Sequence, residues 1–438
     1  MLKKEEAEMK KSLVALAAVL AAGGAAAQSS VTLFGVVDAS VSNYSTKSEY
    51  RGTNPLLYGA SRKQSQTALA NGSSSSSRLG FRGTEDLGGG LAASFWLESG
   101  ITNDDGKTGV AAFDRRSTVS LSGGFGEIRL GRDYTPTYWN DNVFDPFGLR
   151  GVGTSLISRV GDSLSRKAGT APNGASASDN YARASNSIGY FLPPNLGGFY
   201  GQFQYALHEN VKFDENVIES PSKRGSYFGG RVGYANGPLD VAVSYGQDNK
   251  DTTPLTATTV LTPALASQAF KNRINTFNLG ASYDLGAAKL FGEYSQVRNK
   301  FDTATALGAL TFVDSVTDKY DGFLLGVSVP VGPGQIKASY GYVKYKAGQN
   351  GFVNPATALF GNPELSTKAN QFALGYVHNL SKRTALYATI ARVRIKDGQN
   401  NTAVFNRVTT GGAPAYLATA GWAPRSSTGY DFGLRHSF

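Results

Sequence analysis

The sequence of 438 residues contains no cysteine and only 3 histidines. Without cysteine, neither disulfide bonds nor a cysteine-based metal site can hold the chain together. The histidines, at positions 208, 378 and 436, are far apart, and two of them lie where aromatic side chains alternate along expected strands. They are better explained as aromatic surface residues than as ligands. We therefore expect no metal site and no cofactor.

Long apolar runs are also missing. The run from Leu13 to Ala22 is too short to cross a bilayer as a helix, which needs about 20 apolar residues. It follows two lysines and precedes three alanines that end at Ala27, the order of a secretory signal peptide. We expect residues 1–27 to be a signal peptide and residues 28–438 to form one domain. An uncleaved anchor is the alternative, and the acidic stretch before Met9 favours translation from Met9.

Glycine and aromatic residues are abundant instead, with 53 Gly, 22 Tyr and 24 Phe, whereas charged residues make up 17%. This composition is typical of transmembrane β-barrels, in which apolar residues occupy every second position and aromatics form girdles. The C-terminus has the clearest pattern, because Tyr430, Phe432, Leu434, His436 and Phe438 alternate with small or charged residues. A soluble protein rarely ends on an apolar edge strand, since such an edge invites aggregation. The pattern favours a strand that closes a barrel.

Similar alternation predicts sixteen strands, arranged as a first strand, seven hairpins and a last strand. They span Val31–Val41, Arg78–Leu87, Leu91–Ile101, Phe113–Ser122, Gly126–Tyr134, Arg183–Leu192, Phe199–Leu207, Gly225–Ala235, Leu239–Gln247, Ile274–Asp284, Ala287–Val297, Asp321–Val329, Gly334–Tyr345, Gln371–Asn379, Thr384–Ile395 and Thr428–Phe438. Tight turns alternate with long connections, so the long connections emerge on one side. The sequence thus predicts an all-β fold, a 16-stranded antiparallel transmembrane barrel. A soluble sandwich or propeller is the alternative, but no blade repeat of about 40 residues is visible.

Motifs for catalysis are missing. Gly106-Lys107-Thr108 resembles the end of a phosphate-binding loop, but the preceding glycine, Gly100, is one residue too far away. There is no G-x-S-x-G motif, and no nucleophile–base pair can be defended from the sequence. We expect no enzymatic activity.

The formal net charge of +10 would ordinarily suggest nucleic acid as a partner. Here the basic residues do not form one run, and many fall at inward positions of the expected strands, which predicts anions inside the barrel and no nucleic-acid partner. Arg78, Arg82, Arg116 and Arg183 have inward parity, and Arg115 could turn inward through a β-bulge. Guanidinium groups stay charged and offer planar donor pairs to carboxylate and phosphate. The alternative is that these charges only solvate a water-filled lumen.

The connection at 136–182 is too long for a simple link between two strands. Folded inward, it would narrow the lumen and place Asp141 and Asp145 opposite the arginines. Opposed charges across a constriction create a transverse field that orients dipolar solutes. An ordinary outer loop is the alternative.

Several segments resemble the trimeric general porins of Gram-negative bacteria, specifically the beta-proteobacterial type. The matching segments are Ser30–Gly35, Ser77–Gly88, Arg115–Leu121, Gly126–Arg132, Gly375–Thr384 and the C-terminal strand. The resemblance implies a 16-stranded barrel that forms a homotrimer in outer-membrane lipid, with the third loop folded into the pore. It implies constriction roles for Arg78, Arg115 or Arg116, and Arg183, with Asp141 and Asp145 on the loop and Glu98 as a further acidic position. It also implies that the barrel-assembly machinery reads the C-terminal motif ending at Phe438.

We therefore expect an outer-membrane porin of a Gram-negative bacterium, an anion-preferring channel for passive diffusion of small hydrophilic solutes. A substrate-selective porin for phosphate or organic anions is one alternative. A surface adhesin or structural barrel is another, because the outer loops at 43–76, 248–273 and 396–427 are longer than those of the family.

Overall fold

The computed structural model describes residues 30–109, 112–169, 180–209, 225–251, 267–307, 310–348, 365–417 and 421–438. The expected signal peptide at 1–27 lies outside the described residues. No helix within the described ranges is long and apolar enough to cross a membrane.

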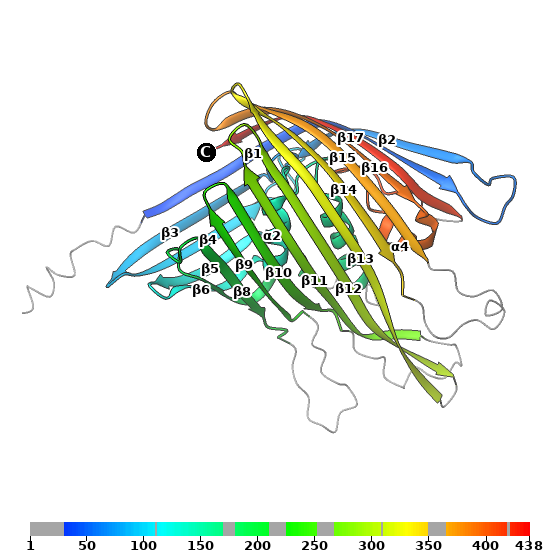
Figure 1. The fold of residues 1–438 in the computed structure, drawn as a ribbon, viewed down its shortest axis with the longest axis horizontal. Coiled ribbons are helices and arrows are strands. Elements are labelled where there is room, and N and C mark those ends of the chain that lie inside the picture. Colours follow the sequence, from blue (N-terminus) through cyan, green and yellow to red (C-terminus); the bar gives the residue numbers. More distant parts are fainter. Residues whose placement is uncertain are drawn as a thin grey trace, which may run out of the picture.

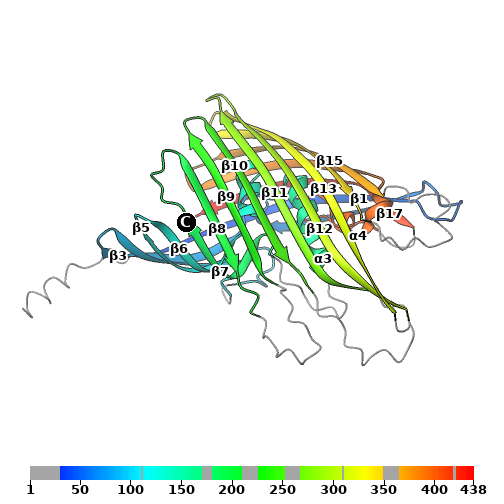
Figure 2. The ribbon, with the colours of Figure 1, turned by 60° about the horizontal axis from the view of Figure 1, so that its bottom comes forward.

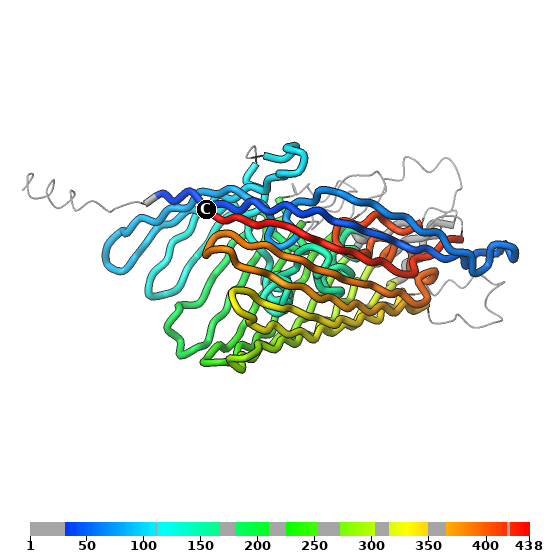
Figure 3. The backbone as a smooth tube through the Cα atoms, turned by 90° about the horizontal axis from the view of Figure 1, so that it is seen from above, coloured from blue at the N-terminus to red at the C-terminus, as the bar shows by residue number. Residues whose placement is uncertain are grey.

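Antiparallel strands form a closed cylinder (Figures 1 and 3). The strands are β1 (Ser30–Tyr50), β2 (Ser61–Asn71), β3 (Arg78–Gly88), β4 (Leu91–Gly100), β5 (Arg116–Gly123), β6 (Gly126–Tyr134), β7 (Arg183–Phe191), β8 (Phe199–Ala206), β9 (Tyr227–Asn236), β10 (Leu239–Asn249), β11 (Ser267–Asp284), β12 (Lys289–Leu307), β13 (Leu310–Val331), β14 (Gly334–Lys346), β15 (Ser366–Asn379), β16 (Thr384–Lys396) and β17 (Trp422–Ser437). From β3 onward each strand pairs with the next, and β17 returns to pair with β1. Figure 3 shows the red C-terminal strand beside the blue N-terminal strand at this seam.

The 17 strands fill sixteen positions, because β2 and β3 share one place beside β1. β3 pairs with residues 30–36 of β1, and β2 pairs with residues 39–49. The predicted all-β, 16-stranded antiparallel barrel is therefore confirmed.

Two hairpins extend farther than the sequence predicted. Residues 43–76, expected to be a loop, contain the end of β1 and the whole of β2. β2 is exposed on both faces over most of its length, so it lacks the alternation that reveals a half-buried strand. The pairing of β12 with β13 likewise continues to Leu307 and Leu310, where the predicted strands ended at Val297 and began at Asp321. Both extensions lie at the ends away from the tight turns.

Side chains alternate strictly between the two faces of the cylinder. In β17, Tyr430, Phe432 and Leu434 are exposed on the outer face, whereas Asp431 between them is 2% exposed on the inner face. A strand points successive side chains to opposite faces, so the apolar face looks outward and the polar face lines the interior. This is the reverse of a soluble barrel, whose apolar residues face inward.

The connection between β6 and β7 contains two helices, α2 (Pro136–Phe144) and α3 (Leu156–Gly169). Figures 1 and 2 show them within the cylinder. Glycines on the inner faces of distant strands receive this segment: Phe144 lies on Gly280 of β11, Pro146 on Gly326 of β13 and Phe147 on Gly375 of β15. Glycine has no side chain, so the segment approaches the strand backbone closely there.

α3 is fixed by an apolar cluster. Leu156, Ile157, Val160 and Leu164 are at most 1% exposed and pack with inward residues of β11–β16. The connection after β16 adds a 3-10 helix, η3 (Gly398–Asn401), and α4 (Thr402–Phe405), whose Phe405 joins the same cluster. The segment from Pro136 to Gly169 is therefore held against the β9–β15 side and leaves the β3–β7 side open.

Candidate functional site

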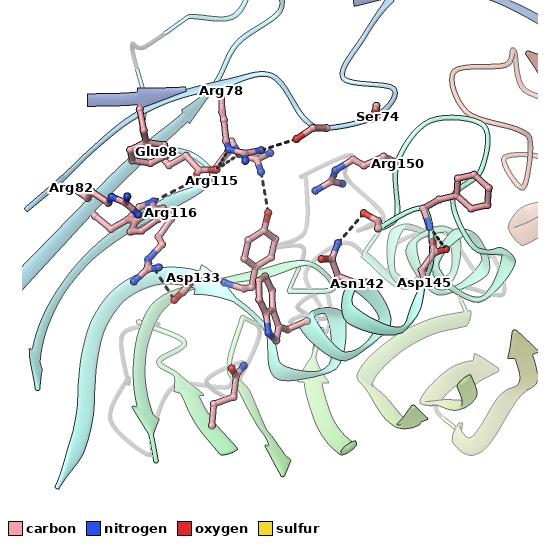
Figure 4. A pocket seen from close by; sticks show the side chains of 18 of the residues that line it. Ser74, Arg78, Arg82, Glu98, Arg115, Arg116, Asp133, Asn142, Asp145 and Arg150 are labelled. Carbon is pink, nitrogen blue, oxygen red and sulfur yellow. Dashed lines mark hydrogen bonds and ion pairs between the residues drawn. The ribbon is translucent and has the colours of Figure 1, made fainter. Parts of the chain in front are cut away.

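A cavity of about 850 Å³ lies between the β3–β7 wall and the inserted segment. Figure 4 shows the side chains of the wall and those of the segment facing each other. The cavity is lined by Phe34, Ser74, Ser75, Arg78, Arg82, Trp96, Glu98, Arg115, Arg116, Arg129, Asp133, Tyr134, Trp139, Asn142, Asp145, Pro146, Phe147, Gly148, Arg150, Phe191, Gln202 and Lys337. Seven of these residues are cationic and three are acidic, so the lining carries an excess of positive charge.

Glu98 on β4 organises one group of arginines. Its Oε1 lies 2.5 Å from Nε of Arg115 and 3.7 Å from Nε of Arg78, and its Oε2 accepts a 3.1 Å hydrogen bond from Trp96. Arg115 precedes β5 and also donates to the hydroxyl of Tyr134, at 3.0 Å. Arg78, at the start of β3, donates to the carbonyl of Ser76. One carboxylate thus orients two guanidinium groups without cancelling both charges.

A second group surrounds Asp133 on β6. Its Oδ2 lies 2.5 Å from Arg129 and 3.7 Å from Arg116, and Arg129 also pairs with Glu127 at 2.9 Å. Both Arg115 and Arg116 therefore line the cavity, each with its own acidic partner.

Aromatic rings support the arginines of the wall. The guanidinium of Arg116 lies 4.6 Å from the ring centre of Trp96, and that of Arg82 lies 5.2 Å from the same ring and 5.5 Å from Phe34. A cation over an aromatic face is attracted by the ring quadrupole, which fixes the guanidinium without consuming its hydrogen-bond donors. Arg82 lines the cavity and makes no ion pair with any described residue.

The opposite side of the cavity carries Arg150 on the inserted segment and Lys337 on β14. Neither makes an ion pair within the described part of the chain. Asp145 also lines this side, but its carboxylate accepts hydrogen bonds from the backbone amides of Phe147, Leu149 and Ser155 at 3.0–3.1 Å. Burial raises the pKa of Asp145, and these amides counteract the rise. Asp145 therefore shapes the turn of the segment and presents little acidic surface to the cavity.

Two of the expected constriction residues lie elsewhere. Arg183 is not among the cavity-lining residues; its guanidinium lies 4.3 Å from the ring centre of Tyr134 and donates to that hydroxyl at 2.7 Å. A register shift between Gly131 and Asp133 displaces the parity from which an inward position was predicted. Arg183 therefore contacts the lining of the cavity at Tyr134.

Asp141 points away from the cavity, to the wall behind α2. It is 2% exposed and accepts hydrogen bonds from Asn278 and from Tyr181, the latter at 3.2 Å. Burial raises the pKa of Asp141 to about 6. Of the two aspartates expected to face the arginine wall, only Asp145 borders the cavity.

Three charged residues of the lining were not predicted from the sequence. Arg129 alternates with the outward Ile128 and Leu130, so parity alone could have placed it inward. Asp133 lies just beyond the register shift between β6 and β7, so the alternation along β6 does not by itself place its side chain. Arg150 lies outside any helix or strand, where no alternation exists.

The last residue of the chain lies at the seam of the cylinder. The backbone of Phe438 exchanges two hydrogen bonds of 3.1 Å with Gly35 of β1. The ring of Phe438 covers Gly35 on the outer face, where a Cβ would overlap it. The C-terminal residue is therefore part of the closure between the first and last strands.

Sequence comparisons relate the chain to known channels. Residues 12–398 match the family described as Gram-negative porin. The chain is 38% identical over 431 residues to outer membrane porin protein 32 of Delftia acidovorans, covering 98% of this chain and 100% of that protein. It is 31% identical over 405 residues to an outer membrane porin protein of Bordetella pertussis, covering 87% and 93%.

Solved structures agree with the sequence relationship. The anion-selective porin from Comamonas acidovorans superimposes with a TM-score of 0.62 at 34% identity, covering 94% of this chain and 100% of that one. The trimer form of OmpT from Vibrio cholerae gives a TM-score of 0.53 at 15% identity and shares the fold.

Proposed function

This chain belongs to the Gram-negative porin family and is an outer-membrane porin, and we propose that it passes small hydrophilic solutes by passive diffusion with a preference for anions. The protein resides in the outer membrane of a Gram-negative bacterium. Its relatives are channels and not enzymes. We propose that this chain also has no catalytic activity.

The observation that carries the anion preference is the unequal pairing of charges in the cavity. Each of its three carboxylates has its own ion pairs or backbone amides, whereas Arg82, Arg150 and Lys337 make no ion pair among the described residues. A unit charge about 4 Å from an ion in water contributes about 1 kcal/mol, or roughly a fivefold change in occupancy. The interaction fades over about 8 Å at physiological salt. An ion passing between the two sides therefore meets a net positive field.

A substrate-selective porin for phosphate or organic anions is the second candidate. The observation that favours it is the fixed position of Arg82 and Arg116 on Trp96. Guanidinium groups held with their donors directed into a cavity provide a planar fork for carboxylate or phosphate.

Assembly and processing are further parts of the proposal. Homotrimer formation, recognition of the C-terminal strand by the barrel-assembly machinery, and removal of residues 1–27 are supported by the family resemblance. The hydrogen-bonded position of Phe438 beside Gly35 supports a role for the C-terminal strand in closing the barrel.

The test is the reversal potential of the purified protein in a planar bilayer under a potassium chloride gradient. We expect the sign that corresponds to chloride permeating faster than potassium. Cation preference, or no conductance, would overturn the proposal. Saturable conductance that millimolar phosphate or dicarboxylate blocks would select the second candidate, and a barrel without conductance would select the adhesin.

A further inference from the structure

Strand β2 has one edge without a partner strand in the described part of the chain. It pairs in register with residues 39–49 of β1, and no other described strand runs beside it. Its side chains are exposed on both faces from Ser61 to Thr67. Figure 1 shows the hairpin of β1 and β2 projecting beyond the neighbouring strands. We call the side of β2 that faces away from β1 the free edge.

The two ends of the pairing determine which backbone groups point to the free edge. The N–H of Tyr50 donates to the carbonyl of Ala60 at 2.8 Å, and the N–H of Gly72 donates to the carbonyl of Asp38 at 2.9 Å. No register shift interrupts the pairing between these ends. Hydrogen-bonded pairs alternate with non-hydrogen-bonded pairs in an antiparallel ladder, so the even-numbered residues of β2 bond to β1. The odd-numbered residues therefore direct their N–H and C=O groups to the free edge.

The free edge carries positive charge on both faces. Lys63 lies directly opposite Lys47 of β1, and both side chains are exposed. Like charges directly opposite each other destabilise a sheet. On the other face of β2, the guanidinium of Arg62 lies 5.1 Å from the ring centre of Trp422. None of these three cations makes an ion pair with a described residue.

The hairpin cannot supply the missing negative charge itself. Between residues 39 and 71 the only acidic residue is Glu49. Its carboxylate already pairs with Arg51 at 2.7 Å and with Arg425 at 3.2 Å. β2 has no acidic residue, so the free edge of a second copy of the chain would bring only the same positive charge. The occupant that complements the free edge is therefore a different, acidic molecule.

We infer that the free edge of β2 binds an acidic protein segment in extended conformation, as an added strand. In such binding, main-chain hydrogen bonds give affinity and alternate side chains give specificity. A glutamate beside Lys63 would form a cross-strand pair of opposite charge and relieve the repulsion from Lys47. The free edge from Ser61 to Leu69 is roughly 26 Å long at about 3.3 Å per residue. It lies at the end away from the tight turns, which faces outward in outer-membrane barrels, so the partner is outside the cell.

The test measures the binding of a fluorescent peptide to the purified protein in detergent by fluorescence anisotropy. The peptide has about nine residues, the length of the free edge, and glutamate alternates with threonine in it. The comparison ligands are a lysine–threonine peptide and the glutamate–threonine peptide methylated on its backbone nitrogens. We expect both to bind at least about tenfold more weakly, because the first repels Lys63 and the second lacks the N–H donors of a strand.

Two variants separate backbone pairing from charge. Ser65→Pro removes an N–H that points to the free edge and keeps the bonds to β1, since proline is tolerated on the open side of an edge strand. It should weaken binding about tenfold, whereas Ser65→Thr should bind like wild type. K47Q/K63Q should also weaken binding about tenfold at low salt. The matched control K382Q/R383Q, on the tight turn between β15 and β16, should retain wild-type affinity.

Binding to the cationic cavity inside the barrel is distinguished by R82Q/K337Q, which removes two cavity cations and leaves β2 unchanged. This variant should bind the peptide like wild type. A loss of binding in R82Q/K337Q but not in Ser65→Pro would place the peptide in the cavity and overturn the inference. No binding, or equal binding of the methylated peptide, would overturn it as well. Lys63 would then only protect an exposed edge against association, as lysine does on many edge strands.

Discussion

The ring of Phe438 lies directly on Gly35, and the two residues exchange a pair of backbone hydrogen bonds. The ring of Phe438 thereby occupies the space that a side chain at Gly35 would fill, at the seam where the first and last strands close the cylinder. Aromatic cover of an outward glycine recurs at Gly230, next to the ring of Phe203.

Replacing Phe438 with alanine should lower the yield of folded barrel. Phe438 is 43% exposed, so it buries about half of its side chain, and its loss should destabilise the closed state by about 1 kcal/mol. The measurement is the fraction of protein in the heat-modifiable folded form after refolding into vesicles. Phe438→Tyr keeps the ring and should refold like wild type. Inserted channels of Phe438→Ala should keep their ion selectivity; an altered selectivity would show that the seam and the lumen are coupled.

Removing two unpaired cations from the cavity should reduce the anion preference. Arg82 and Lys337 make no ion pair in the described structure. The carboxylate of Asp145, which interacts with the charge of Lys337, keeps its three backbone hydrogen bonds in R82Q/K337Q. Two unit charges near the permeating ion should change the anion-to-cation permeability ratio by roughly five- to tenfold. K382Q/R383Q, on the tight turn between β15 and β16, is the matched control, because it removes two cations that do not border the cavity. An equal shift in the control, measured as reversal potential, would mean that net charge and not position sets selectivity.

Glu98→Gln should have the opposite effect on selectivity. The amide keeps the shape of Glu98 but no longer neutralises Arg115 and Arg78, so the anion preference should rise by roughly fivefold. Leaving two half-buried guanidinium groups without their carboxylate should also lower the free energy of unfolding by about 1–3 kcal/mol. Reversal potential and urea titration measure the two effects. Glu49→Gln, on the outer hairpin, should leave the selectivity unchanged.

Adding a side chain at Gly280 should displace the inserted segment. A Cβ at this position would overlap the ring of Phe144, so Gly280→Val should cost about 1–3 kcal/mol and loosen α2 from the wall. Single-channel conductance should then increase, with larger current fluctuations. Gly292→Val, where no atom lies within 4 Å of the added Cβ, is the control. An unchanged conductance in Gly280→Val would show that Phe144 does not limit the opening.

The docking of α2 should weaken as the pH rises. Burial raises the pKa of Asp141 from 3.8 to about 6, and Glu293, Asp145 and Tyr181 are the titratable groups close to it. Asp141 holds its proton more tightly in the folded state than in the unfolded state. The stabilisation of the docked α2 by protonated Asp141 is therefore complete below about pH 4 and is lost as the pH rises through about 6. Amide hydrogen exchange of residues 136–149, corrected for the intrinsic pH dependence of exchange, should become faster between pH 5 and pH 7.5. Asp141→Asn should remove the extra dependence; its persistence would assign the effect to another group.

The sequence was most informative where one face of a strand meets lipid. Alternation of the kind seen in Tyr430, Phe432 and Leu434 located the barrel strands because the contrast between the faces is large. It could not reveal β2, where both faces meet water and no contrast exists.

For the site, parity located Arg78, Arg82 and Arg116 on the cavity wall, since their strands are regular there. It misplaced Arg183, because Ser185 and Asn186 of the same strand lie opposite the single residue Arg132 of β6, and this extra residue shifts the parity of β7 before Arg183. Asp141 and Asp145 lie four residues apart, yet only one borders the cavity. Which face of an irregular segment meets the wall depends on long-range packing, here on Gly280 and Gly375, and not on local pattern.

The inserted segment begins and ends on adjacent strands, at Tyr134 and Arg183, yet its middle rests on Gly375 across the lumen. The number of residues between α2 and α3 thus determines how far the inserted segment extends across the lumen, and no strand pairing depends on that number. A short insertion or deletion there would reset the largest solute that passes while the barrel keeps every hydrogen bond between its strands. We therefore expect mutations in this one loop to change the size limit of the channel without changing the stability of the barrel wall.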